Sequence, residues 1–108
     1  MALIIHDGET SPTAPTKDPQ SDVWYGFEYS LESGEVITGS QWLIDDVLVT
    51  AGQTVNGLTF VDKDNSGSVT KCRLSGGSSG TNYRLTNRLS TSATPSDDRT
   101  MIIPCEHL

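Results

Sequence analysis

Near the end of the chain the sequence reads Gly80-Thr81-Asn82-Tyr83-Arg84-Leu85-Thr86-Asn87-Arg88-Leu89-Ser90-Thr91-Ser92. Tyr83, Leu85 and Leu89 are two or four residues apart, so an extended chain places them on one face. The opposite face receives Arg84, Thr86, Arg88 and Ser90. A period of two is typical of a strand with one buried face. The stretch therefore predicts a turn that opens into a half-buried β-strand.

The glycine three residues before Tyr83 makes this prediction more specific. A Gly-x-x-Tyr entry into a strand is the pattern of a tyrosine corner, in which the ring packs in the core and the hydroxyl group bonds to nearby backbone. Tyrosine corners are typical of immunoglobulin-like sandwiches. We therefore expect an all-β chain that folds as a single immunoglobulin-like β-sandwich.

Composition agrees with this fold class. A chain of 108 residues is long enough for one domain with a two-layer core. Ser, Thr and Gly account for 36 of the 108 residues, a mixture that suits turns and strands with one solvated face and suits helices poorly. Turn signals and alternating segments predict about seven strands, at 23–29, 36–44, 47–49, 54–61, 68–74, 83–92 and 99–105. We expect Trp42 to lie in the core.

Residues 1–19 differ from the rest because Pro12, Pro15 and Pro19 stand among Ser, Thr and Asp. This composition predicts a flexible, extended N-terminal arm over 1–19, followed by the sandwich over 20–108. The arm is either a free terminus or a docking segment. In the second case Leu3, Ile4 and Ile5 could add as a strand to the sheet edge of a neighbour.

Two polar segments allow more than one interpretation. We interpret 54–61 as one strand with a bulge at Gly57, although Asn56-Gly57 is also a common hairpin turn. We interpret Asp62–Gly67 as a polar turn between strands. Its acidic residues fit the opening of a calcium-binding loop, but the twelfth position is Arg73 where such a loop needs a bidentate Glu.

Charge and cysteine usage exclude several classes of protein. The formal net charge of −7 disfavours nucleic-acid binding, which needs clustered Lys and Arg. No stretch has the length and apolar character of a membrane span or a signal peptide, so we expect no membrane partner and synthesis in a cytoplasm. We expect Cys72 and Cys105 to be reduced and buried, and a bond between them would require the fold to bring them together.

No constellation for catalysis is evident. His6 and His107 lie in the terminal segments, and the adjacent pairs Asp45-Asp46 and Asp97-Asp98 point to opposite faces in extended chain. The glycine-rich run 75–80 has no Lys and no following helix, so it is no phosphate cradle. We expect no enzyme, no cofactor and no metal.

Three further residues are candidates for a protein interface. Arg84 and Arg88 share the outer face of one strand, and Arg is enriched where protein surfaces meet. Acidic residues such as Asp97-Asp98 of another copy or partner would complement them. Trp24 alternates with the core residues of its strand, so it is expected opposite the core. Each of the three is otherwise explained as part of a solvated sheet face.

Several short motifs, in order, resemble a family of small tailed-bacteriophage virion proteins of the neck and tail. They are Lys17-Asp18-Pro19, Tyr25-Gly26-Phe27-Glu28-Tyr29-Ser30, Gly34-Glu35-Val36-Ile37, Trp42, Leu74-Ser75-Gly76-Gly77 and Gly80-Thr81-Asn82-Tyr83-Arg84-Leu85-Thr86-Asn87. The resemblance spans about residues 17–104. The loop 92–99 is longer than the family pattern and lacks its glycine, and the turn 62–67 is unusual for it.

The resemblance implies a non-enzymatic virion protein of the fibre-to-tail adaptor type, present in several copies in a symmetric assembly. Its partners would be other neck, tail or fibre proteins, and it would be assembled in the host cytoplasm. A capsid decoration protein is the nearest alternative. A carbohydrate- or receptor-binding module using an exposed Trp24, and a calcium-stabilised adhesion repeat, are alternatives from other classes.

Overall fold

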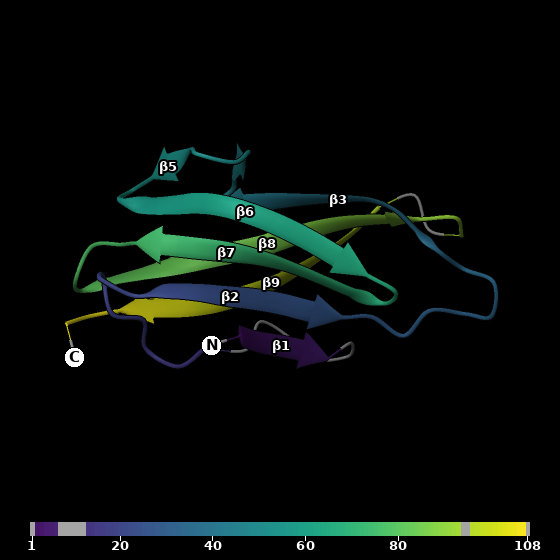
Figure 1. Ribbon diagram of the computed structural model, residues 1–108, viewed down its shortest axis with the longest axis horizontal. Helices are drawn as coiled ribbons and strands as arrows, with labels where there is room; N and C mark the ends of the chain where they lie inside the picture. Colours follow the sequence, from purple (N-terminus) through teal and green to yellow (C-terminus); the bar gives the residue numbers. More distant parts are fainter. Residues whose placement is uncertain (1, 7–12, 94–95, 108) are drawn as a thin grey trace.

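A computed structural model describes residues 2–6, 13–93 and 96–107, the first of these segments by its backbone alone. The described chain is all-β and forms a two-layer sandwich, which confirms the predicted fold class (Figure 1). Its nine strands are β1 (Ala2–His6), β2 (Asp22–Glu28), β3 (Ile37–Ile44), β4 (Val47–Val49), β5 (Thr54–Val55), β6 (Leu58–Ser66), β7 (Val69–Gly76), β8 (Thr81–Thr91) and β9 (Asp97–Cys105).

The order of strands within each sheet is that of an immunoglobulin-like sandwich. Sheet A has the order β1-β2-β7-β6-β5, and sheet B has the order β4-β3-β8-β9. With β1 taken as strand A, these are the A-B-E-D and C′-C-F-G arrangements of that fold, with the short β5 added. The two strands beyond the seven predicted are β1 and β5. The first lies in the N-terminal segment, and the second comes from the division of segment 54–61.

Strand β8 has the two faces that its alternation predicts. Tyr83, Leu85 and Leu89 are almost fully buried between the sheets, while Arg84 and Arg88 are exposed. The Tyr83 hydroxyl donates to the Asn56 carbonyl at 2.6 Å and accepts from the Ser78 amide at 2.8 Å. Tyr83 therefore forms the expected tyrosine corner.

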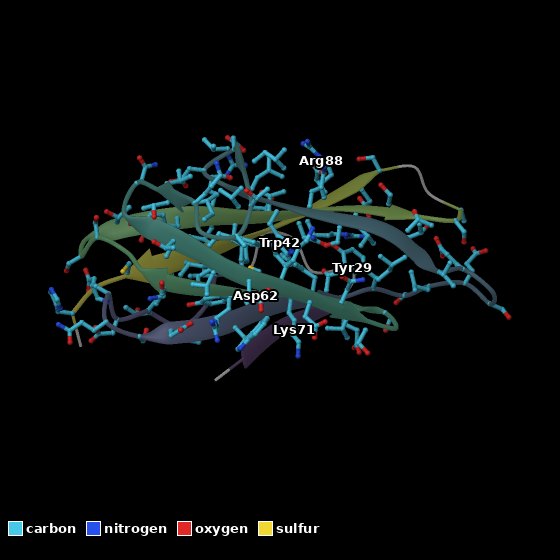
Figure 2. All side chains as sticks on the ribbon, turned by 45° about the horizontal axis from the view of Figure 1, so that its top comes forward. Tyr29, Trp42, Asp62, Lys71 and Arg88 are labelled. Atoms are coloured by element: carbon cyan, nitrogen blue, oxygen red, sulfur yellow. The ribbon has the colours of Figure 1, made fainter. Side chains whose placement is uncertain are left out.

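The core lies between the two sheets and is rich in aromatic side chains. Tyr25, Phe27 and Tyr29 point inward from β2 and the residues after it, and the Phe27 ring lies 6.0 Å from that of Trp42. Only 1% of Trp42 is exposed, so it is the core tryptophan that we expected. Figure 2 shows Trp42 and Tyr29 within the body of the sandwich.

The interpretation of segment 54–67 was wrong in two respects. Asn56 and Gly57, with φ of 50° and 88°, form the two-residue turn of a hairpin between β5 and β6. The turn 62–67 does not exist, because β6 continues to Ser66. The irregularity in β6 lies between Phe60 and Asp62, where the register with β7 shifts by one residue.

That shift is a β-bulge, and it has a physical consequence. Leu58 and Phe60 are buried, and strict alternation would carry Asp62 and Asp64 to the same core face. The extra residue at the bulge turns both carboxylates outward, opposite Arg73 and Lys71 of β7. The polar segment 62–66, whose composition is typical of a loop, can therefore form part of a strand.

Residues 13–17 run beside sheet B. Thr13 and Lys17 form parallel bridges with Ile102 and Cys105 of β9. In addition, β1 lies along the outer edge of β2 in sheet A (Figure 1). The division between arm and sandwich at residue 19 stays a prediction.

The strand predicted at 99–105 starts two residues earlier than expected, because β9 begins at Asp97. Asp97 and Asp98 therefore belong to a paired strand instead of a loop.

Cys72 and Cys105 are both free and buried.

Candidate interface surfaces

The outer face of sheet B carries a row of two leucines and two threonines that crosses all four strands. The register aligns Leu48 of β4, Leu43 of β3, Thr86 of β8 and Thr100 of β9. Within this row Leu48 is 49% exposed and Thr100 is partly exposed, whereas Leu43 and Thr86 are only 7% and 5% exposed. The hydroxyl groups of Thr86 and Thr100 hydrogen-bond to each other at 2.8 Å. Each hydroxyl therefore has a hydrogen-bond partner within the protein.

The two arginines predicted as interface residues flank this row. Arg84 lies two residues to one side of Thr86 on β8 and pairs through Nη1 with Asp46 Oδ2 at 2.8 Å. Arg88 lies two residues to the other side and forms a two-pronged pair with Asp98, at 3.0 and 3.1 Å. This pair raises the pKa of the Arg88 guanidinium, chiefly through its hydrogen bonds.

We call Leu43, Leu48, Arg84, Thr86, Arg88 and Thr100 the row face. The acidic residue that complements Arg88 belongs to the same chain, so Arg88 does not need Asp98 of another copy as its counter-ion. An apolar centre with a charged rim is the usual anatomy of a protein–protein interface. The row face is therefore suited to contact with another protein.

Trp24 lies on the opposite side of the molecule, in the middle of the outer face of sheet A. It is half-buried, and its ring lies 5.4 Å from Lys71 Nζ and 5.8 Å from the Arg73 guanidinium carbon. Both distances are within the range of cation–π attraction. Figure 2 shows Lys71 and Arg88 on opposite sides of the sandwich. The neighbours of Trp24 are therefore strand residues of a sheet face, and two of them are cations.

The residues Leu3, Ile4 and Ile5 belong to β1. The structure pairs them in parallel with Tyr25, Gly26 and Phe27 of the same chain. This places the third predicted interface element at the edge of sheet A, beside the strand that carries Trp24.

A pair of adjoining grooves lies at the end of the sandwich, where the chain passes from β2 to β3. They have volumes of about 390 and 450 Å³ and share Leu31 and Glu35 in their linings. Glu35 accepts hydrogen bonds from the Thr91 hydroxyl and the Glu32 amide, and these lower the pKa of its carboxyl group. Val36, which is 58% exposed, lines the second groove.

Sequence reasoning missed two buried polar residues that join the sheets. Asn87 has no exposed surface, and Lys17 is 2% exposed. The Lys17 ammonium donates to the carbonyls of Asp18, Ser21 and Gly76 at 3.0, 2.6 and 2.7 Å. Burial lowers the pKa of Lys17 despite these bonds. Both residues occur in the motifs quoted above. Asn87 lies between Leu85 and Leu89 at a position that the period of two assigns to the buried face, and this signal could have found it. The neighbours of Lys17 in the sequence give no such sign.

Within the described ranges no three or more His, Cys, Asp or Glu side chains are grouped closely enough to hold a metal ion. Those ranges also contain no helix that is long and apolar enough to cross a membrane.

The distinctive surfaces of this small β-sandwich are the row face and the aromatic–cation cluster at Trp24, and surfaces of both kinds are suited to contact with other proteins. Residues 17–104 match the family model of the podophage GP4 fiber-tail adaptor protein gp77, and the chain belongs to this family. This confirms the resemblance seen in the sequence. No curated protein and no solved structure matches the chain.

Proposed function

We propose that this protein joins a tail fibre to the tail of a podophage virion as a non-enzymatic structural component. The family match over 17–104 is the observation that carries this proposal. The protein acts in several copies, within a virion assembled in the host cytoplasm, and its partners are tail and fibre proteins.

An adaptor needs two contact surfaces that do not obstruct each other. The row face belongs to sheet B and Trp24 to sheet A, and Arg88 of the first and Lys71 beside the second lie on opposite sides of the sandwich (Figure 2). We assign one partner to the row face, with Arg84 and Arg88 at its rim. The second partner contacts the side formed by Trp24 and the strand of Leu3, Ile4 and Ile5.

Contact through the row face is favoured by the burial of Leu48. Half of this side chain is exposed in the free protein, and its removal from water would stabilise a complex by about 1 kcal/mol or more. Arg84 and Arg88 already have counter-ions, so they can enter the rim without a buried unpaired charge.

The test measures binding of the purified chain to the fibre protein and to the tail complex of its own phage, by light scattering after size separation. Leu48→Glu places a charge in the row face and is expected to weaken binding to one partner at least tenfold. Val36→Glu is the matched control, since Val36 is exposed to a similar degree in the groove at the end of the sandwich.

The outcomes separate the assignments. Normal binding by Leu48→Glu, or a loss with Val36→Glu instead, would remove the row face from the proposal. A wild-type chain that binds neither fibre nor tail protein would overturn the adaptor function itself. Antibody labelling of intact virions that marks the capsid surface would support a decoration protein.

A further inference from the structure

Strand β1 is held differently from every other strand of the sandwich. Among the strands of the described ranges it is an edge strand whose one partner is β2, in parallel, from Ala2 opposite Trp24 to His6 opposite Glu28. A parallel partner cannot be joined to β2 by a tight hairpin, so the connection must be long. Here it is formed by residues 7–21.

Residues 13–17 of this connection are held by contacts that do not involve β1. Residues 13–17 run beside β9, the Lys17 amide donates to the Pro104 carbonyl, and the Lys17 ammonium reaches Gly76 of sheet A. The family match also begins at residue 17, after β1. The sandwich therefore has its own anchor at Lys17, and β1 is an addition to a strand edge that exists without it.

We propose that β1 is exchanged between copies, so that residues 2–6 of one copy pair with β2 of the next in the same parallel register. This rests on the proposed function only in that several copies must stand side by side. The backbone hydrogen bonds are the same whether the strand comes from its own chain or from a neighbour. Such exchange of an identical element is a low-cost route to assembly.

The length of the connection permits the exchange. From His6 to Thr13 there are seven residue steps, which span at most about 25 Å in extended chain. The two shorter dimensions of the molecule are 24 and 21 Å. A copy that lies against the β2 edge of its neighbour can therefore deliver β1 across the contact.

Concentration decides which pairing forms. Within one chain the strand has an effective concentration of about a millimolar for its own β2 edge. Exchange is therefore suppressed in dilute solution and favoured when copies are crowded in an assembly. This difference protects free chains from premature association through an apolar strand.

The experiment uses two full-length variants, His6→Cys in one and Glu28→Cys in the other, distinguished by a tag. They are mixed, unfolded, refolded together at concentrations from about 10 µM to 1 mM, and oxidised. A strand shared between chains holds these two cysteines opposite each other and so favours a bond between the two chains over bonds formed by random collision. The matched control pairs His6→Cys with Asp22→Cys, which lies about 20 Å away along β2.

We expect the linked dimer to form several-fold more with Glu28→Cys than with Asp22→Cys, and to increase with concentration. A yield no higher than the Asp22→Cys control at every concentration would overturn the proposal. A chain carrying both His6→Cys and Glu28→Cys must close its own bond when dilute, and failure to do so would refute the register. No fibre or tail protein is present, so these outcomes are separate from the test of adaptor function.

Discussion

The most connected single residue in the core is Asn87, which uses all of its side-chain hydrogen-bonding groups. Its Oδ1 accepts from the hydroxyls of Tyr29 and Thr70, which belong to the sheet A side, both at 2.8 Å. Its Nδ2 donates to Ser40 Oγ and the Gln41 carbonyl of β3 at 2.8 and 3.0 Å. A fully satisfied buried amide of this kind links the two sheets at a defined register.

Asn87→Ala leaves the hydroxyls of Tyr29 and Thr70 buried without this acceptor. We expect the free energy of unfolding to fall by about 2–4 kcal/mol, measured by urea denaturation. Asn82→Ala, at an exposed position on the same strand, should change it by less than about 0.5 kcal/mol. Equal losses in the two variants would show that the buried network has no special role.

The buried thiol of Cys72 makes stability depend on pH in the alkaline range. Burial raises the pKa of this thiol, so the folded state keeps a proton that the unfolded chain loses above about pH 8.5. The folded state then binds more protons than the unfolded state, and the free energy of unfolding falls as pH rises. Lys17, whose pKa is lowered, acts in the opposite direction.

The free energy of unfolding, measured with urea, should fall between about pH 7.5 and pH 10 in the wild type. In Cys72→Ala this fall should be smaller by up to about 2 kcal/mol. The contribution of Lys17 cancels because both proteins contain it. Leu74→Val, a buried change on the same strand without a titrating group, should follow the wild-type pH dependence. A Cys72→Ala curve parallel to the wild type would contradict the assignment.

At the scale of the elements, the β5–β6 hairpin depends on its glycine for two separate reasons. Gly57 has a φ of 88°, which side chains rarely adopt, and a Cβ there would lie 2.6 Å from Ser78 Oγ. The same turn supplies the Asn56 carbonyl that accepts the Tyr83 hydroxyl. The hairpin and the tyrosine corner are therefore built together.

Gly57→Ala should lower the free energy of unfolding by about 1–2 kcal/mol, of which about 1 comes from the backbone conformation and the smaller remainder from turning the exposed Ser78 hydroxyl away. Gly52→Ala isolates that conformational part, because Gly52 has a φ of 92° with no atom near the added Cβ. Ser78→Ala combined with Gly57→Ala should recover the remainder. Identical losses at Gly52 and Gly57 in thermal or urea unfolding would rule out the steric contribution.

Over the whole molecule, Lys17 ties the N-terminal segment to both layers of the sandwich. Its backbone pairs with Pro104 and Glu106 beside sheet B, and its ammonium reaches Gly76 in sheet A. The charge is buried at a cost in solvation, which the three carbonyl groups offset. This one residue therefore joins the two sheets, with its backbone beside β9 at the edge of sheet B and its side chain at sheet A.

Lys17→Met keeps the length of the side chain but leaves three carbonyl groups without its hydrogen bonds. We expect a loss of about 2–4 kcal/mol in urea unfolding. Lys63→Met is the matched control, since the exposed Lys63 ammonium donates to the Ser40 carbonyl alone and its loss should cost under about 1 kcal/mol. A Lys17→Met protein as stable as the wild type would show that the segment 13–19 is not needed to close the sandwich.

The sequence by itself determined the β class, the inner and outer faces of β2 and β8, and the core positions of Tyr83 and Trp42. These properties follow from a local period of two and from turn residues beside it. Its ordered motifs also identified the adaptor family.

Only the tertiary structure decided how the polar residues are used. The alternation through Leu58 and Phe60 could not reveal the bulge before Asp62, because a bulge is defined by the partner strand. Nor could it show that Arg88 meets Asp98, that the row face crosses four strands, or that β1 lies on β2. Each of these depends on register between distant segments, and the buried Lys17 depends on carbonyl groups that only the assembled sandwich brings together.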